Sequence, residues 1–164
     1  IRRPPRSTQG VSSAASDVYK RQEALRLYKD LVKNKASADP TKLAGDVGTN
    51  ERIAFAANGI DEMECILMRN FDRMMECVNA GEEIPMDERI MYRYQSSLII
   101  EKSIAVVDHL FNVAGGGSVF LNSEIQQRFL DIHTARAHVA NNPTSFGRNL
   151  GATQLGLENG DVFL

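Results

Sequence analysis

A run of three glycines and two histidines are the residues of this chain whose types and spacing could do chemistry. The glycines at 115–117 precede Ser118, and His133 and His138 follow on the next predicted helix. Because glycine lacks a Cβ atom, backbone N–H groups there can approach a ligand closely, and a helix start offers unpaired N–H donors to an anion. An imidazole exchanges protons near neutral pH. The pattern predicts a ligand held by the glycines, with the histidines within its reach.

Each of these features also has a purely structural interpretation. A glycine run after a helix is very often a C-cap and tight turn. A lone histidine on a helix is more often a surface residue or a hydrogen-bonded core residue than a catalytic one. His133 and His138 are five residues apart, which rotates them by about 140° around a helix, so both cannot face one site. They also lack the i, i+4 spacing of a helical metal pair, and no metal site is predicted.

The first 22 residues differ in composition from the rest of the chain. They carry five basic residues against one acid, with two prolines and many small polar residues. We interpret residues 1–22 as translated sequencing-adapter read-through, with a basic disordered arm or an Arg- and Ser-rich transit peptide as alternatives. Taking them away from the 19 basic and 21 acidic residues leaves 14 against 20. That acidic balance argues against nucleic-acid binding.

Length and composition fit a single domain without a membrane segment. The 164 residues are 43% hydrophobic, enough to fill one core. No apolar run approaches the roughly 18 to 20 residues of a membrane helix. Cys65 and Cys77 are twelve residues apart in one predicted helix, a rise of about 18 Å that a disulfide cannot bridge. We therefore expect reduced thiols with packing roles and a cytoplasmic location.

Apolar residues recur at helical spacing along the chain and predict an all-α, antiparallel up-down-up-down four-helix bundle. The first helix is expected over 23–36 and ends before Asp39-Pro40, because the residue before a proline avoids the helical region. The second is expected over 49–79, closed by Gly81, and the third over 85–114. Helices of this length joined by short loops imply antiparallel neighbours.

The fourth helix is expected to begin at Ser123 and to end before 141–143. The Ser-x-x-Gln spacing of Ser123 and Gln126 is typical of a capping box, and Asn141-Asn142-Pro143 is expected to stop the helix. Its expected buried stripe is Ile125, Phe129, Ile132, Ala135 and Val139.

Several short segments resemble the C-terminal helical domain of the acyl-CoA dehydrogenase superfamily. They are similar above all to the branch of two-component flavin-dependent monooxygenases that includes 4-hydroxyphenylacetate, steroid A-ring and dibenzothiophene oxygenases. The matching segments lie, in order, at 110–116, 121–123, 127–129, 131–133, 137–138 and 156–161. The resemblance covers 23–164 and implies the C-terminal bundle domain of a larger flavoenzyme, with the first helix truncated. Such a fragment is expected to be inactive alone.

The resemblance implies an oxidoreductase that uses reduced FMN or FAD delivered by a separate flavin reductase. In that family O2 adds at the flavin C4a position, and a small aromatic or related substrate is hydroxylated by a homotetrameric enzyme. His138 falls where the family places a histidine at the reactive edge of the flavin. By that match it is the catalytic residue, which hydrogen-bonds the flavin hydroperoxide or takes the proton of a phenolic substrate. The implied cofactor-binding residues are Gly115, Gly116, Gly117 and Ser118.

Two other functions remain open at this point. A true acyl-CoA dehydrogenase carries a glutamate base near this part of the chain, but the corresponding stretch, 133–138, contains no carboxylate. A non-catalytic helical module that mediates assembly would leave His138 and the glycines without a ligand. The arginine with which the family often meets the flavin phosphate is also replaced, since its region reads Lys33-Asn34-Lys35.

Overall fold

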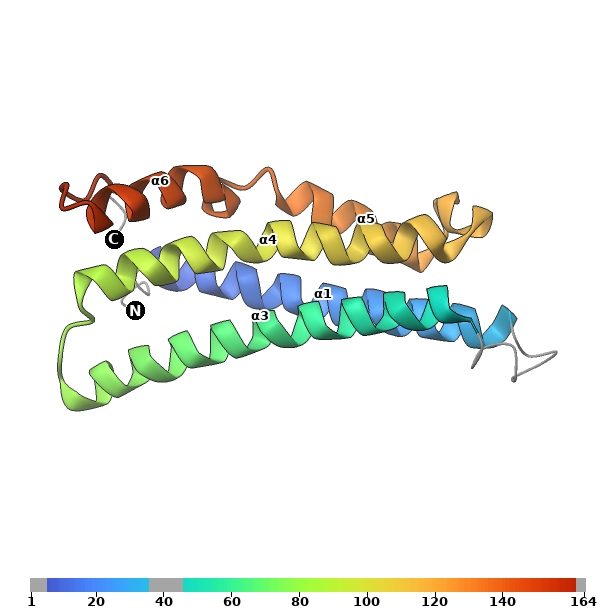
Figure 1. Ribbon diagram of the computed structural model, residues 1–164, viewed down its shortest axis with the longest axis horizontal. Helices are drawn as coiled ribbons and strands as arrows, with labels where there is room; N and C mark the ends of the chain where they lie inside the picture. The colour runs from blue at the N-terminus through green and yellow to red at the C-terminus, as the bar shows by residue number, and fades with distance from the viewer. Residues whose placement is uncertain (1–5, 36–45, 162–164) are drawn as a thin grey trace.

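The computed structural model describes residues 6–35 and 46–161, and every element within these ranges is helical. Five α-helices and two short 3-10 turns follow one another, and no strand occurs in these two ranges, so the all-α prediction is confirmed (Figure 1). The elements are α1 (Arg6–Lys35), α3 (Val47–Ala80), α4 (Met86–Ala114), η1 (Gly116–Val119), α5 (Glu124–Ala135), η2 (Val139–Asn141) and α6 (Pro143–Gln154).

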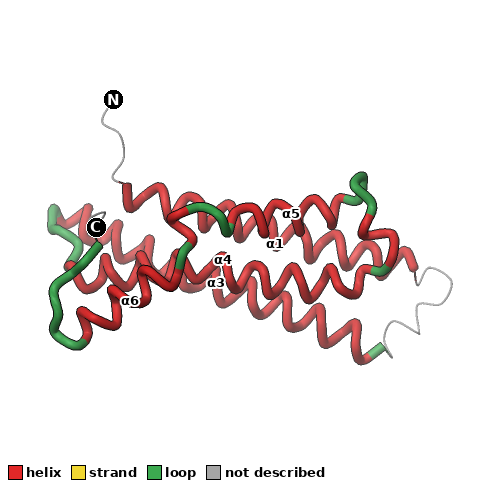
Figure 2. The backbone as a smooth tube through the Cα atoms, turned by 90° about the horizontal axis from the view of Figure 1, so that it is seen from above, coloured by secondary structure: helices red, strands yellow, loops and turns green. Residues whose placement is uncertain are grey.

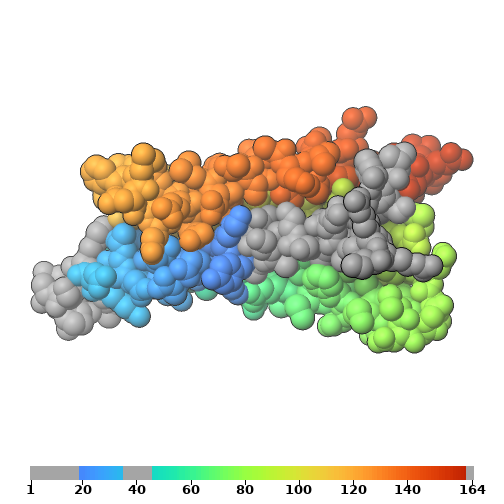
Figure 3. Space-filling model, turned by 180° about the vertical axis from the view of Figure 1, so that it is seen from behind, coloured from blue at the N-terminus to red at the C-terminus, as the bar shows by residue number. Residues whose placement is uncertain are grey.

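The helices form four antiparallel rods. α1, α3 and α4 each make one rod, whereas α5 and α6 follow one another along α4 and together make the fourth (Figure 1). Seen from above, α6 is displaced sideways from the line of α5 (Figure 2). Seen from behind, α5 also lies against the C-terminal half of α1 (Figure 3). The up-down-up-down bundle is therefore confirmed, with its last rod divided in two.

The core lies where the apolar stripes of the helices meet. Leu25 and Tyr28 of α1 and Ile60 and Met63 of α3 are buried, as the helical spacing predicts. The longest contribution comes from α4, whose buried apolar residues are Ile90, Ile99, Ile100, Val106, Val107, Leu110 and Ala114. α4 thus contacts every other rod and is the central element against which the rest of the bundle is positioned.

The first helix is longer than predicted. α1 begins at Arg6 rather than near residue 23, directly after the prolines at 4 and 5, which are tolerated at a helix start but not inside one. Arg21 is buried, and its Nη1 donates to the carbonyl oxygen of Ile99 at 3.0 Å and to the hydroxyl of Ser103. The expected boundary at 22–23 is therefore not a structural boundary. The origin of residues 1–22 stays a prediction, and Asp39-Pro40 lies outside the described residues.

The ends of α3 are fixed by local capping. Oδ1 of Asp46 accepts a hydrogen bond from Thr49 N at 3.1 Å, which satisfies one free N–H of the first turn. Gly81, with φ of 71°, closes the other end in the left-handed conformation, and its N–H bonds the last turn. The prediction that Gly81 ends this helix is confirmed. Neither cysteine forms a disulfide, and Cys77 is buried as expected, but Cys65 is exposed, so its predicted packing role is wrong.

The predicted fourth helix is wrong over its second half. α5 ends at Ala135, residues 136–138 form a turn, and Pro143 begins α6 instead of stopping a helix. A proline at the first helical position loses no hydrogen bond, which is why Asn-Asn-Pro marks a start here. Val139, expected in the buried stripe, is 74% exposed because it lies beyond the break. Ser123 occupies the N-cap position of α5, but its side chain makes no capping hydrogen bond, so the capping box is wrong as well.

The missed helix α6 packs closely on α4. A Cβ atom at Gly147 would lie 2.8 Å from Cε2 of Tyr94, so the glycine permits the close approach of the two helices. Next to it, the guanidinium of Arg93 lies 4.1 Å from the ring centroid of the buried Phe146. Among residues 6–35 and 46–161, no helix has the length and apolar character that crossing a membrane requires.

Candidate functional site

The glycine turn after α4 combines one glycine that the backbone requires with two that it does not. Gly115 has φ of 89° and ψ of 175°, a conformation that residues with a side chain rarely adopt. Gly116 and Gly117 begin η1 and are exposed, and no atom of the described residues lies within 4 Å of a Cβ placed on either one. The open space beside Gly116 and Gly117 therefore lies on the outer surface of the chain.

The side chain of Ser118 forms a hydrogen bond within the same glycine turn. Its side chain is 3% exposed, its Oγ donates to the carbonyl oxygen of Gly115 at 2.6 Å, and its N–H donates to the same oxygen at 2.9 Å. The hydroxyl of Ser118 thus stabilises the turn. The next three residues, Val119, Phe120 and Leu121, are exposed and place large apolar side chains beside the two open glycines.

His138 lies in the exposed turn beyond α5, not on the helix itself. It occupies the N-cap position of η2, and its Nδ1 accepts a hydrogen bond from Ala140 N at 3.1 Å. A neutral imidazole has one donor and one acceptor nitrogen, so this bond assigns the proton of neutral His138 to Nε2. The turn therefore presents a single N–H donor at an exposed position.

One chain does not bring the glycine turn and His138 together. They lie at opposite ends of α5 (Figure 1), which has 12 residues and is therefore about 18 Å long. A ligand that contacted both in one chain would have to extend along this helix.

His133 forms part of the packing between α4 and α5. Its Nε2 lies 2.7 Å from Oδ1 of Asp108, and its ring centroid lies 4.3 Å from that of Phe129. Phe129 in turn stacks on Phe111 with centroids 4.4 Å apart. Because His138 is not helical, the predicted 140° rotation between the two histidines does not describe their relation. His133 is held by neighbours within the bundle, whereas His138 faces outward.

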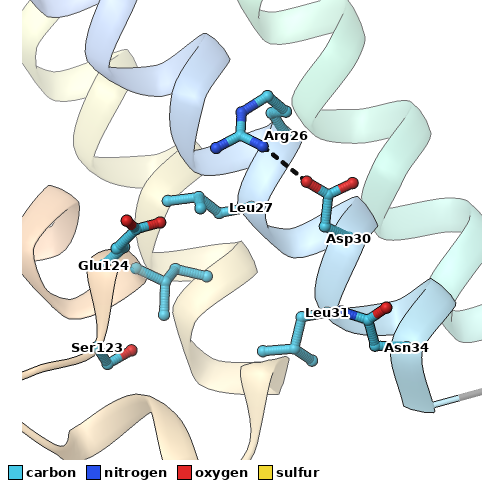
Figure 4. Close-up of a pocket in the computed structure, with 8 residues that line it drawn as sticks. Arg26, Leu27, Asp30, Leu31, Asn34, Ser123 and Glu124 are labelled. Atoms are coloured by element: carbon cyan, nitrogen blue, oxygen red, sulfur yellow. Dashed lines mark hydrogen bonds and ion pairs between the residues drawn. The ribbon is translucent and has the colours of Figure 1, made fainter.

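A pocket of about 610 Å³ opens between the C-terminal half of α1 and the start of α5 (Figure 4). Its lining residues are Arg26, Leu27, Asp30, Leu31, Asn34, Ser123, Glu124 and Ile125. Arg26 is the one cation among them, and it is bonded to Glu23 at 2.6 Å and Asp30 at 2.7 Å. The hydrogen bond from Arg26 holds the pKa of the Glu23 carboxyl below its usual value. The pocket contains neither His138 nor any residue of the glycine turn, and its cation is already neutralised.

Comparison with known families identifies the class of this bundle. Residues 14–143 match the family described as acyl-CoA dehydrogenase, C-terminal domain. The chain belongs to this family. The match begins within residues 1–22 and ends at the proline that starts α6.

Within that class the chain is similar to oxygenase subunits of flavin-dependent monooxygenases. It is 32% identical over 123 residues to the oxygenase subunit HsaA of Mycobacterium tuberculosis, a match that covers 75% of this chain and 31% of the relative. It is 26% identical over 148 residues to the HsaA subunit of Rhodococcus jostii. That match covers 90% of this chain and 37% of the relative. The chain thus spans about a third of the length of the curated relatives that it matches.

The fold agrees with that similarity. The crystal structure of the HsaA monooxygenase from M. tuberculosis superposes with a TM-score of 0.89 at 27% identity. The match covers 99% of this chain and 41% of that one. The helical bundle of this chain is therefore a fold that it shares with the HsaA monooxygenase from M. tuberculosis.

Two residues to which the sequence alone assigned no role in the site shape it. Asp108 fixes His133, and Asn141 donates its side-chain amide to the carbonyl oxygen of Ala135 at 2.8 Å. The three-residue spacing of Asp108 and Phe111 on one helical face could have pointed to Asp108. For Asn141 the available signal was a polar residue at the end of an apolar stripe, which we read only as a helix stop.

Proposed function

We propose that this chain forms the C-terminal domain of a longer reduced-flavin-dependent monooxygenase that hydroxylates a small aromatic substrate in the cytoplasm. A separate flavin reductase supplies the reduced flavin, as the two-component organisation of similar proteins suggests. The similarity to HsaA oxygenase subunits supports this proposal. The observation that carries it is His138, an exposed histidine whose tautomer is fixed by the hydrogen bond from Ala140.

The glycine turn fits the approach of a flavin. Gly116 and Gly117 leave open space on the outer surface where a side chain would otherwise stand. The neighbouring exposed residues, Val119, Phe120 and Leu121, offer apolar surface for an aromatic ring system. Ser118 supports the turn from inside through its bonds to Gly115. When bound, reduced flavin supplies the activation of O2 that no amino-acid side chain provides.

The geometry of His138 favours one of its two expected roles. A general base needs a free lone pair at the nitrogen that faces the substrate. In this turn the lone pair of Nδ1 is occupied by Ala140 N–H, and the outward Nε2 carries the proton. His138 therefore acts as a hydrogen-bond donor at the reacting end of the flavin and not as the base that deprotonates a phenol.

The length of α5 supports a shared site. Because the glycine turn and His138 lie at opposite ends of α5, which is about 18 Å long, we infer that each flavin contacts these two features in different copies of the chain. A homotetramer in which bundles pack against one another provides this arrangement.

The experiment uses the full-length oxygenase mixed with O2 and reduced FMN or FAD, without substrate. The readout is the rate at which H2O2 is released. We expect His138→Ala to raise this rate at least tenfold, and His138→Gln, which keeps an N–H donor, to raise it less. His109→Ala serves as the matched control, since His109 lies within α4 beside Phe55.

Two outcomes would contradict the proposal. If His138→Ala releases H2O2 at the wild-type rate with both flavins, His138 has no role at the flavin. If the full-length protein binds neither flavin, the bundle is an assembly module. An acyl-CoA dehydrogenase is disfavoured by residues 133–138, which contain no carboxylate base.

A further inference from the structure

The turn that carries His138 is closed on both sides by Asn141. The side-chain Nδ2 of Asn141 donates to the carbonyl oxygen of Ala135 at 2.8 Å, and its backbone N–H donates to the carbonyl oxygen of His138 at 2.9 Å. The N–H of His138 donates to that same Ala135 oxygen at 3.1 Å. One residue therefore bonds the last carbonyl of α5 and the carbonyl of His138.

Asn141 makes these bonds from a buried position. Asn141 is 3% exposed and Ala140 is 7% exposed, because η2 packs against α4. Its neighbour Asn142 is exposed and makes no capping hydrogen bond with its side chain. A buried amide that bonds the backbone specifies one conformation, since leaving its partners unpaired costs free energy. The turn around His138 is thereby anchored to the central helix.

We propose that Asn141 is a positioning residue for His138. By closing the segment from Ala135 to Asn141, it keeps the N–H of Ala140 within reach of His138 Nδ1 and so keeps the proton of the neutral ring on the outward Nε2. The catalytic consequence rests on the function proposed above for His138. The positioning itself is a property of this chain and can be measured without flavin.

The imidazole of His138 is an exposed side chain that would be mobile without a fixed hydrogen-bond partner. His138 is solvent-exposed, and the hydrogen bond that its ring makes within the described residues joins it to the backbone of the turn. Without the Asn141 amide, that turn loses the longest of its closing bonds, which spans six residues. The Ala140 N–H then meets Nδ1 only part of the time, and the ring can carry its proton on either nitrogen.

The first experiment measures the 164-residue chain itself by NMR. The ¹⁵N shifts of the His138 ring report which nitrogen is protonated, and hydrogen exchange reports how long the Ala140 amide stays bonded. We expect one dominant Nε2–H tautomer in the wild type. Asn141→Ala should give a mixture of tautomers and at least tenfold faster exchange at Ala140. Asn142→Ala, the same change at the exposed neighbour, should leave both unchanged.

The wild-type protein provides a test that does not depend on the folding of a variant. The side-chain amide protons of Asn141 should exchange at least tenfold more slowly than those of Asn142. If the two amides exchange alike, or if Asn141→Ala folds and keeps the wild-type tautomer and exchange rate, the proposal is wrong.

The full-length oxygenase then connects position to catalysis. Asn141→Ala should raise H2O2 release from reduced FMN in O2, by less than His138→Ala does. The double variant should match His138→Ala alone, because both changes act through the same imidazole. A double variant with multiplied effects would overturn the positioning role. If His138→Ala itself has no effect, the proposed function fails, while the NMR result still decides whether Asn141 holds the turn.

Discussion

His133 Nε2 lies 2.7 Å from Oδ1 of Asp108 and so joins the end of α5 to the C-terminal part of α4. The two side chains are 35% and 39% exposed, which means that solvent screens the pair. The ring of His133 also packs on Phe129, so the histidine contributes both a polar and an aromatic contact. Its role is to hold α5 at its C-terminal end, just before the turn that leads to His138.

We expect a double-mutant cycle on this pair to give a small coupling energy. Asp108→Ala and His133→Ala should each lower stability, and their coupling should be about 0.2–1 kcal/mol, the range for solvent-exposed side-chain pairs. Urea unfolding of the four proteins measures it. A coupling indistinguishable from zero would show that the contact contributes nothing to the fold.

The glycine turn should separate into one structural and two functional positions. Gly115→Ala should destabilise the bundle by about 1–3 kcal/mol, because φ of 89° strains any side chain. Gly116→Ala and Gly117→Ala should leave the unfolding midpoint within the error of measurement, since a Cβ there meets no described atom. In the full-length oxygenase the same two variants should bind reduced flavin at least tenfold more weakly. Unchanged flavin affinity would remove the turn from the binding site.

Two glycines of α6 should respond in opposite directions to the same substitution. Gly151→Ala should stabilise the chain by about 0.5–1 kcal/mol, because alanine favours a helix and the described residues leave space for its Cβ. Gly147→Ala gains the same propensity but places Cβ 2.8 Å from the Tyr94 ring, an overpacking that costs about 1–3 kcal/mol. Thermal melts of both variants test this. Equal changes in melting temperature for Gly147→Ala and Gly151→Ala would mean that α6 does not pack on Tyr94.

The phenol of Tyr92 should have a pKa well above that of an ordinary tyrosine. Burial, together with the hydrogen bond that its hydroxyl donates to Glu88 at 2.6 Å, raises the pKa of Tyr92 to about 12. Since the folded protein favours the neutral phenol, this stabilisation is fully present below pH 10 and is lost as the pH rises through about 12. The difference in ultraviolet absorbance between wild type and Tyr92→Phe, followed against pH, should therefore give an ionisation curve with its midpoint near pH 12. Glu88→Gln should move it to lower pH, and an unmoved curve would leave burial as the sole cause.

Periodic apolar residues made most of the bundle predictable from sequence. Leu25 and Tyr28, or Ile60 and Met63, repeat every three or four residues, so the buried face and the helix are specified together. Gly81 could be identified as a helix end because its left-handed backbone depends on glycine alone. These signals are local, because each depends only on residues that are close together in the sequence.

The break at Ala135 could not be predicted in this way. No proline or glycine lies between Ala135 and Asn141, so the segment reads as continuing helix. The turn exists because Ala140 and Asn141 pack against α4 and because the Asn141 amide bonds Ala135, contacts that depend on the neighbouring rod. Pro143 was equally ambiguous, since a proline is compatible with both the end and the start of a helix.

Only part of the candidate site could be predicted, because some of its residues are placed by local sequence and others by tertiary packing. The glycine turn was recognisable from composition, but the inward direction of Ser118 follows from its bond to Gly115. The position of His138 depends on the break, so its distance from the glycines could not be obtained from a continuous helix. Residues placed by local backbone rules were thus predictable, and those placed by tertiary packing were not.

The contrast between Cys65 and Cys77 makes the chain a ready-made spectroscopic reporter. Cys65 is exposed on the outer face of α3, whereas Cys77 is 1% exposed. A thiol-reactive fluorophore or spin label should therefore attach to Cys65 alone, without removal of the second thiol. Distances between labels at this one position in an assembly of this chain would report how many bundles associate and how α3 is oriented in each.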